Sequence, residues 1–335
     1  MKIIKLITAV ILLITILFFS ACEMKKTRLP HSTGKTSEML VVTNNKAQWN
    51  SKIGEKIKEF FGQEQICLPQ PEPLFTMFNI PEKSFSKMFK PNRNIFIVDI
   101  NKKIEKPQIE SKKDFWAIPQ RVIKITAPND SSFIKIFNEN KEAILSLYQE
   151  VERERINKAF ASIKQGKVIA ELDRNLMLTL SIPSGYKVAV KGNNFMWIRK
   201  ETLKESQGII IYCFNYTDTN SFNLENIIAK RNEITKKYIP GPTNDSYMQV
   251  SEEVILPVAK QINFNDQFAI ETRGLWKVEG DFMGGPFLSY TLIDELRNRV
   301  ITIDAYVYAP KDNKRNLLLQ LEAILHTLKI SEIKE

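Results

Sequence analysis

Hydrophobic residues follow two different spacings in the first half of the chain. A spacing of three to four residues, as on one face of a helix, runs over 49–61 and over a longer stretch from Asn129 to Gln165. Short apolar runs, typical of buried strands, lie before and between these stretches. We expect helices over 49–61 and 129–165, the second ended by Gly166, and strands over 38–42, 74–80, 94–100 and 115–127.

The second half of the chain also runs through strands to a closing helix. Strands are expected over 176–182, 186–200, 208–216, 267–278, 288–294 and 299–308, and helices over 222–238 and 315–328. Because strands come in runs with helices interspersed irregularly, the pattern favours an α+β fold with mainly antiparallel sheets packed against helices. We expect two such domains, over 38–166 and 167–335.

A nearly continuous apolar run over residues 3–19 follows two lysines and leads through two small residues to Cys22. This order is typical of a bacterial secretion signal that is cleaved just before a lipid-modified cysteine. We therefore expect a signal peptide over 1–21, acylation of Cys22 that anchors the protein to a membrane, and a flexible tether over 22–37. An uncleaved membrane span is the alternative, since a run of this length approaches the about 20 residues that cross a bilayer.

Composition indicates a folded and mildly basic protein. The chain is 43% hydrophobic and 10% aromatic, as in globular domains. Its formal net charge of +10 comes from dispersed lysines and glutamates, which predicts weak attraction to anions and no nucleic-acid partner. Beyond Cys22 the cysteines are Cys67 and Cys213. Their apolar neighbours indicate two separately buried thiols, and a disulfide between them is the alternative in an oxidising compartment.

Few motifs point to catalysis. Ser84 and Lys87 have the Ser-x-x-Lys spacing of penicillin-recognising enzymes, but the companion motifs of those enzymes are missing, and Ser84 is expected to cap a helix. The two histidines, His31 and His326, do not support a zinc site or a nucleophile-base pair. We expect no catalytic set of that kind, no metal and no cofactor. A pair of carboxylates needs no sequence motif, so catalysis by such a pair stays open.

The most distinctive segment is 273–287, which combines charge, aromatic side chains and a Gly-Gly-Pro sequence. Glycines before a proline let a backbone turn sharply or approach a ligand closely. We expect a binding loop here, with the candidate residues Arg273, Trp276, Asp281, Phe282, Gly284, Gly285 and Phe287. The alternative is an ordinary tight turn between two strands, with its aromatic residues in the core.

Five stretches of the chain carry a family resemblance, namely 29–35, 68–75, 273–276, 281–287 and 304–310. Together they resemble an uncharacterised family of Gram-negative lipoproteins, a domain of unknown function. The resemblance implies export and lipid anchoring, and it assigns no catalytic residues. Separately, residues 181–186 and the closing helix over 317–328 are similar to the α/β/α sandwich of a photosystem oxygen-evolving accessory protein and a nuclear-import factor. That sandwich is a candidate fold for the second domain.

These features predict a non-enzymatic, lipid-anchored protein of the cell envelope. Its expected partners are the membrane, through acylated Cys22, and an envelope protein or glycan. Because the residues after Cys22 do not form an acidic run, we expect the protein at the outer membrane, facing the periplasm. An envelope hydrolase that uses a carboxylate pair is the alternative function.

Overall fold

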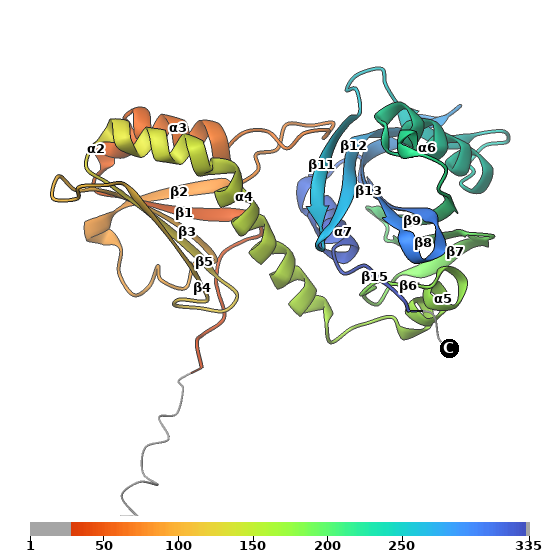
Figure 1. Ribbon diagram of the computed structural model, residues 1–335, viewed down its shortest axis with the longest axis horizontal. Helices are drawn as coiled ribbons and strands as arrows, with labels where there is room; N and C mark the ends of the chain where they lie inside the picture. Colours follow the sequence, from red (N-terminus) through yellow and green to blue (C-terminus); the bar gives the residue numbers. More distant parts are fainter. Residues whose placement is uncertain (1–27, 333–335) are drawn as a thin grey trace, which may run out of the picture.

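A computed structural model describes residues 28–332, which form two large sheets, each with its own helices, and one small two-stranded sheet (Figure 1). The expected signal peptide and Cys22 lie outside the described residues. None of the described helices is long and apolar enough to cross a membrane. The predicted α+β fold, with two domains and mainly antiparallel sheets, is confirmed.

The N-terminal sheet has five strands in the order β2-β1-β3-β5-β4. They are β1 (Glu38–Thr43), β2 (Thr76–Pro81), β3 (Asn94–Ile100), β4 (Gln108–Lys113) and β5 (Arg121–Ala127). One face is covered by α2 (Lys46–Trp49), α3 (Lys52–Phe61) and α4 (Asp130–Phe160). Loops that carry Phe85, Phe89 and Trp116, next to the 3-10 helix η1 (Glu82–Ser84), cover the other face.

Three of the four strand pairings in this sheet are parallel, unlike the antiparallel pairing expected for this domain. The edge strand β4 runs antiparallel to β5. The strands β1, β3 and β5 are buried along most of their length. Unbroken apolar strands of this kind are typical of parallel sheets with both faces covered. The sequences of these strands therefore fit the parallel arrangement.

The C-terminal sheet has eight antiparallel strands in the order β10-β12-β13-β14-β9-β8-β7, with β11 also paired to β12. They are β7 (Lys187–Gly192), β8 (Phe195–Glu201), β9 (Ser206–Asn215), β10 (Tyr247–Ser251), β11 (Val258–Phe264), β12 (Gln267–Glu279), β13 (Gly284–Asp294) and β14 (Arg299–Tyr308). A separate small pair joins β6 (Leu178–Thr179) and β15 (Lys329–Ile330).

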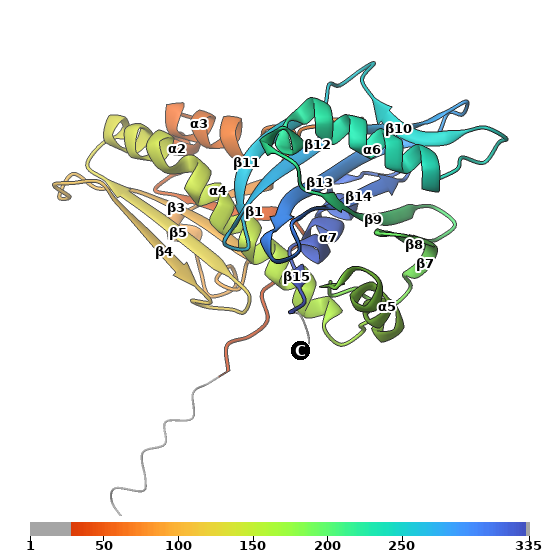
Figure 2. The same ribbon diagram turned by 45° about the vertical axis from the view of Figure 1, so that its right-hand side comes forward.

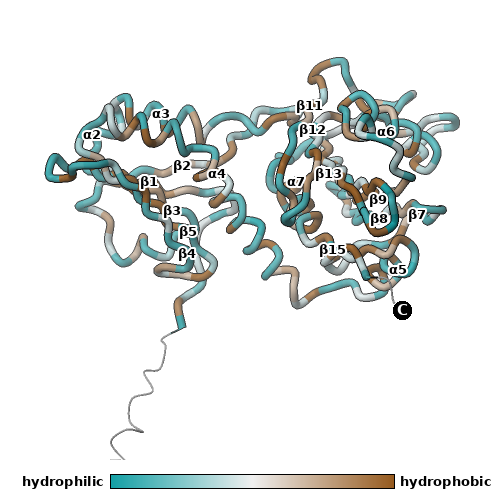
Figure 3. Tube along the Cα trace, viewed as in Figure 1, coloured by the Kyte–Doolittle hydropathy of each residue, from teal (hydrophilic) through white to brown (hydrophobic). Residues whose placement is uncertain are grey.

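Helices pack on both faces of the C-terminal sheet, which gives the α/β/α layering of the candidate fold. On one face lies α6 (Leu224–Tyr238), preceded by the 3-10 helix η2 (Thr219–Phe222). On the other lie α5 (Gly166–Leu176) and α7 (Arg315–Leu325). The 3-10 helix η3 (Glu295–Arg297) joins β13 to β14. The strands between the helix layers are the most hydrophobic part of this domain (Figure 3).

Gly166 begins a helix instead of ending one. The long helix α4 stops at Phe160, and α5 follows over residues expected to lead into a strand. Val168, Leu172 and Leu176 recur every four residues and form the buried face of α5. That spacing is a helical signal that the sequence offered and that the strand prediction over 176–182 overlooked.

The first described residues are held against the N-terminal domain, although they fall in the expected tether over 22–37. The backbone N–H groups of Ser32 and Thr33 donate to the carbonyl groups of Ile118 and Pro91, at 3.1 and 2.8 Å. The sequence suggested that the N-terminal domain starts at residue 38. The folded part of the chain therefore begins earlier than predicted.

The two domains meet where the proline-rich loop over 68–73 reaches the start of α7 (Figures 1 and 2). The Glu72 carboxylate accepts hydrogen bonds from the backbone N–H groups of Lys314, at 2.6 Å, and Arg315, at 3.2 Å. The helix has no cap from its own side chains, and two basic residues stand at its positive end. Glu72 therefore supplies from the other domain both the missing acceptor and the favourable charge.

On the other side of the joint, α4 lies along α7. Arg153 forms an ion pair with Glu322, at 3.1 Å, and the Asn157 amide donates to the carbonyl of Ala323, at 2.9 Å. Leu68 extends the core of the C-terminal domain from the N-terminal side. Polar and apolar contacts together therefore fix the domains to each other.

We predict that Glu72→Ala lowers the free energy of unfolding by about 1–3 kcal/mol, because it leaves buried N–H donors of α7 without partners. Urea titration followed by circular dichroism measures the change. Glu64→Ala is the matched control, since Glu64 is an exposed glutamate of the same loop region. Equal effects of the two substitutions would show that the cap does not stabilise the joint.

Candidate functional site

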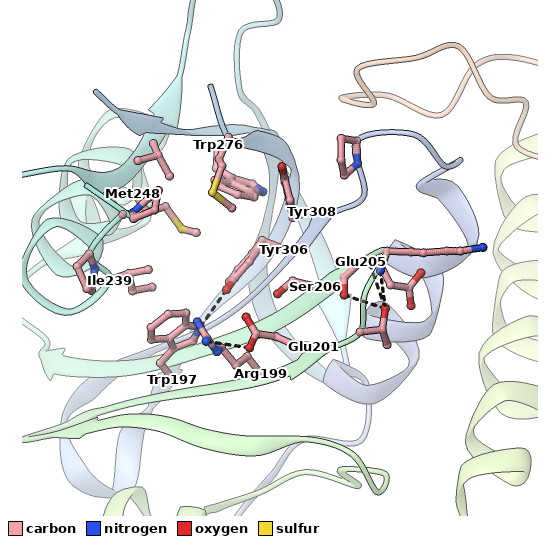
Figure 4. A pocket seen from close by; sticks show the side chains of 18 of the residues that line it. Trp197, Arg199, Glu201, Glu205, Ser206, Ile239, Met248, Trp276, Tyr306 and Tyr308 are labelled. Carbon is pink, nitrogen blue, oxygen red and sulfur yellow. Dashed lines mark hydrogen bonds and ion pairs between the residues drawn. The ribbon is translucent and has the colours of Figure 1, made fainter. Parts of the chain in front are cut away.

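A cleft of about 730 Å³ opens on the α6 face of the C-terminal sheet (Figure 4). It lies at the end of the sheet where the β8–β9 and β12–β13 turns come together with the end of β14. Cavities that bind small molecules usually measure about 300–1,000 Å³. The cleft is therefore large enough for a small ligand.

One row of paired residues crosses the sheet under the cleft. In order from β12 to β8 the row is Gly274, Phe287, Tyr306, Gly208 and Arg199. Glycine and aromatic residues are thus direct cross-strand neighbours on the same face, where opposite side chains lie about 5 Å apart. The row places the Tyr306 ring in the floor of the cleft and the Phe287 ring in the core beside it.

The glycines allow these rings to lie against the sheet. A Cβ atom at Gly274 would come within 2.6 Å of the Phe287 ring, and one at Gly208 would overlap the Tyr306 ring. No other residue can be placed there without moving an aromatic side chain. Each ring therefore occupies the space above a neighbouring glycine and does not project far from the sheet.

Trp276 and Tyr308 extend the floor toward the mouth of the cleft. Trp276 is paired with Gly285, and Tyr308 is paired with Ser206. The Trp276 indole N–H donates to the carbonyl of Val307, at 3.2 Å. Its ring meets Tyr306 edge-on, with centroids 5.2 Å apart.

Trp197 on β8 closes the other side of the floor. Its indole N–H donates to the Tyr306 hydroxyl, at 3.1 Å (Figure 4). Both tryptophan donors in the cleft are therefore used within the protein. The remaining lining is mostly apolar and comes from the segment after α6, from β10, from the β12–β13 hairpin and from the end of β14: Ile239, Pro240, Gly241, Pro242, Met248, Val278, Met283 and Pro310.

Charged side chains lie at the mouth of the cleft, on and beside the β8–β9 turn. Glu201 pairs with Arg199, at 2.9 Å. The Thr202 hydroxyl and the backbone of Glu205 hold the turn together through hydrogen bonds. Glu201 and Glu205 are the carboxylates of the lining, and neither reaches the buried floor.

The structure places the sequence-predicted site residues in different environments. Trp276 lies in the cleft. Phe287 is fully buried beside it, and Asp281 and Phe282 are at the tip of the β12–β13 turn. Phe282 is fully exposed. The segment over 273–287 is thus a hairpin with its aromatic residues partly in the core, and Trp276 is its candidate residue in the cleft lining.

Gly284 and Gly285 do not form the turn. The residue with a left-handed backbone is Gly280, at φ 82°, while Gly284 and Gly285 begin strand β13. A Cβ atom at Gly285 would collide with the carbonyl of Val307 on the facing segment. These two glycines therefore serve close strand packing next to the Trp276 ring.

Arg273 points to the opposite face of the sheet, away from the cleft. Its guanidinium is buried and pairs with Glu271 and Glu322, each at 2.9 Å. Glu322 also pairs with Arg153 of α4. Burial opposes ionisation of Glu322, but Arg273 and Arg153 outweigh it and lower its pKa to about 2. Arg273 is therefore part of the joint between the domains.

His326 lies beside this ion cluster. Its ring packs on Phe264, with centroids 4.7 Å apart, and its Nε2 atom is 3.2 Å from the Tyr290 hydroxyl. Burial, and then the positive charge of Arg153, lower the pKa of His326 to about 4. The neutral ring is therefore the form that the folded protein favours at neutral pH.

Four residues of the lining were not predicted as site residues from the sequence, namely Trp197, Met248, Tyr306 and Tyr308. The useful signal is the combination of Gly208 with the Tyr-Val-Tyr sequence over 306–308 and of Gly274 with Phe287. A glycine and an aromatic residue on paired strands indicate a ring lying on the sheet. That signal needs the strand register, which the sequence alone did not provide.

Candidate chemistry outside the cleft is sparse. Within residues 28–332 no three His, Cys, Asp or Glu side chains are grouped to hold a metal ion. Cys67 and Cys213 are both buried and free, which confirms the prediction of two separate thiols. Burial raises the pKa of both, that of Cys213 to about 11, so neither thiol is activated.

Two family models match consecutive parts of the chain. Residues 32–161 match a domain of unknown function, DUF8532, and residues 165–327 match a domain of unknown function, DUF4837. The chain therefore consists of two consecutive parts that each match a family of unknown function. A search of curated proteins finds no match.

Solved structures that are similar to part of the chain include two with low sequence identity. The Saccharomyces cerevisiae Ran-binding protein Mog1p is 10% identical, with a TM-score of 0.31, over 47% of this chain and 91% of Mog1p. LpqN, involved in cell envelope biogenesis of Mycobacterium tuberculosis, is 12% identical, with a TM-score of 0.29, over 46% of this chain and 83% of LpqN. At these scores neither likeness supports an argument about fold or function.

We predict that Gly208→Ala displaces the Tyr306 ring and lowers the free energy of unfolding by about 1–3 kcal/mol, as overpacking does. Urea titration measures the loss, and tryptophan fluorescence reports the disturbed contact between Trp197 and Tyr306. Gly166→Ala is the control, because a Cβ atom there meets nothing within 4 Å. A Gly208→Ala protein as stable as this control would contradict the description of the floor.

We predict that His326 makes the protein less stable on mild acidification. Its folded pKa of about 4 lies below the ordinary value of 6.5, so the unfolded chain binds more protons between these pH values. Stability is then fully present above pH 6.5 and falls by up to about 3 kcal/mol as pH drops toward 4.

The test compares urea midpoints of the wild type and His326→Gln between pH 7 and pH 5, above the range in which carboxylates titrate. The wild type should lose stability across this range, and the variant should lose clearly less. Equal slopes would contradict a neutral, buried His326. The other histidine, His31, is exposed.

Proposed function

We propose that this protein is a non-enzymatic, lipid-anchored component of the bacterial outer membrane that holds an envelope ligand in the cleft of its C-terminal domain. The observation that supports this proposal is the aromatic floor, in which rings lie over glycines and leave a cavity of about 730 Å³. The sequence pattern that ends at Cys22 supports the anchor and the periplasmic address.

A binding function fits the lining better than hydrolysis by a carboxylate pair. An acid and a base for hydrolysis must face the same bond in a site that excludes water. Glu201 is exposed and paired with Arg199, and Glu205 belongs to the turn at the mouth. The floor itself offers aromatic faces and no carboxylate. A ligand held there would meet a mostly apolar surface and no carboxylate.

Site-specific photo-crosslinking in native envelopes tests the proposal. A photoreactive residue in place of Leu203, at the mouth of the cleft, should capture a defined envelope component. The same residue in place of Leu296 is the matched control, because Leu296 is also exposed but lies at the other end of the sheet, between β13 and β14.

A second substitution links the product to the cleft. Ser206→Trp would fill the cavity from its floor and should abolish the Leu203 product while the protein stays folded. Cys22→Ser should release the protein from the membrane fraction. Identical products from the Leu203 and Leu296 positions, or a product that survives Ser206→Trp, would refute binding in the cleft.

A further inference from the structure

Both indole N–H groups of the cleft floor are already occupied, and the other side-chain hydrogen-bonding groups there are the hydroxyls of Ser206, Tyr306 and Tyr308. The Trp197 and Trp276 indole N–H groups donate to Tyr306 and to the backbone of Val307. A sugar or a peptide bound deep in the cleft would lose hydrogen bonds to water and find few replacements, and each polar group left unpaired weakens binding. The floor therefore favours the apolar part of a ligand.

The walls have the same character. Ile239 and Met248 lie across the cleft from Tyr306 and Tyr308 (Figure 4), and Met283 is a further apolar residue of the lining. Flexible, polarizable methionine side chains adapt to apolar ligands of varying shape. The binding of an alkyl chain is strengthened by each methylene group that leaves water. The cleft is therefore expected to bind a flexible hydrocarbon chain more tightly than a rigid polar molecule.

Polar groups are confined to the mouth. Arg199 and Glu201 pair there, and Lys204 forms no ion pair with any residue in the described part of the chain. A ligand with a charged or polar end can place that end at the β8–β9 turn, next to water. The lining is therefore graded from an apolar floor to a charged rim, which matches an amphiphile.

Two turns beside the mouth carry unusually exposed apolar side chains. Leu203 on the β8–β9 turn and Phe282 on the β12–β13 turn are 107% and 108% exposed, the highest values among the large hydrophobic side chains of residues 28–332. Leu203 lines the mouth, and Phe282 is next to the lining residue Met283. Side chains in these positions can enter a bilayer surface, and they would then place the mouth where lipid chains are available.

We infer that the occupant of the cleft is an amphiphile, with its alkyl chain on the aromatic floor and its polar head at the mouth, taken up from a bilayer that the Leu203 and Phe282 turns touch. This inference rests on the proposed function and names the ligand class of the same site. The alkyl chain belongs either to a free fatty acid or to a phospholipid, since both combine an alkyl chain with a charged head.

The first test uses the mature chain with Cys22→Ser and a dansyl-labelled undecanoic acid, whose fluorescence rises in an apolar site. We expect saturable binding to the wild type and to Ser206→Ala. Ser206→Trp and Met283→Asp should each weaken binding by about tenfold or more. Circular dichroism and the urea midpoint establish that the variants are folded. Absence of saturable binding to the wild type, or unchanged binding to both folded cleft variants, would overturn the inference.

The second test separates the turns from the cleft. In flotation with phosphatidylethanolamine–phosphatidylglycerol vesicles, Leu203→Asp and Phe282→Asp should reduce the bound fraction while Leu296→Asp does not. Phe282→Asp should leave the affinity for the fatty-acid probe unchanged, because Phe282 is outside the lining. Equal flotation of all three variants would overturn the role of the turns.

Mass spectrometry identifies the molecule to which the bound alkyl chain belongs. The material is extracted from protein that has been purified from its native envelope. A bound fatty acid or a bound phospholipid, each lost in Ser206→Trp, would support the inference and distinguish the two sources. A glycan or a peptide that crosslinks at Leu203 and is lost in Ser206→Trp would overturn the amphiphile and keep the proposed function. No ligand and no specific Leu203 product would overturn both.

Discussion

The C-terminal sheet is apolar on both faces, and the chain provides too little helix to cover one of them. Seven neighbouring strands at about 4.8 Å spacing span about 29 Å, while a helix is about 10–12 Å wide. The single helix α6 covers part of its face, over residues such as Ile210 and Tyr212. The uncovered part is the end of the sheet at which the cleft opens. Its aromatic rings lie flat over glycines, so the exposed surface is small and the depression remains.

A buried ion pair keeps α6 from sliding over this depression. Arg231 of α6 pairs with Asp304 of β14, at 2.8 Å, and both side chains are almost fully buried. The guanidinium also sits 4.0 Å from the centre of the Phe287 ring, which is buried beside the cleft as the cross-strand neighbour of Tyr306. Buried pairs of this kind contribute little net stability, but breaking one by removing a partner is costly. The pair therefore fixes the helix at one position, two residues along β14 from Tyr306.

Hydrophobic spacing was sufficient to predict most elements and the α+β class. Strands β3 and β14 have the predicted bounds, and α4 begins at Asp130, one residue after the predicted start of the helical pattern. Spacing could not separate strands joined by a tight turn. Residues 186–200, predicted as one strand, form the hairpin β7–β8, because Asn194 adopts a left-handed backbone that reverses the chain.

The site was harder to predict because it depends on register. Trp276 drew attention as an aromatic residue in a glycine-rich segment, and it does line the cleft. Arg273 is three residues away in the same strand and faces the other side, because side chains alternate along a strand. Tyr306 and Gly208 are almost a hundred positions apart, and strand pairing alone makes them neighbours. Local sequence carried no information about that pairing.

The cleft and the joint between the domains share one segment of chain. Strand β14 ends at Tyr308 in the floor, Pro310 lines the mouth, and Lys314 begins the helix that Glu72 caps. The Lys314 ammonium also donates to Gln70 of the proline-rich loop, at 2.8 Å. A short stretch over 308–314 thus connects the ligand-facing end of the sheet to the N-terminal domain. Because that stretch is held at both ends, the position of the N-terminal domain and the shape of the mouth are set by the same few contacts.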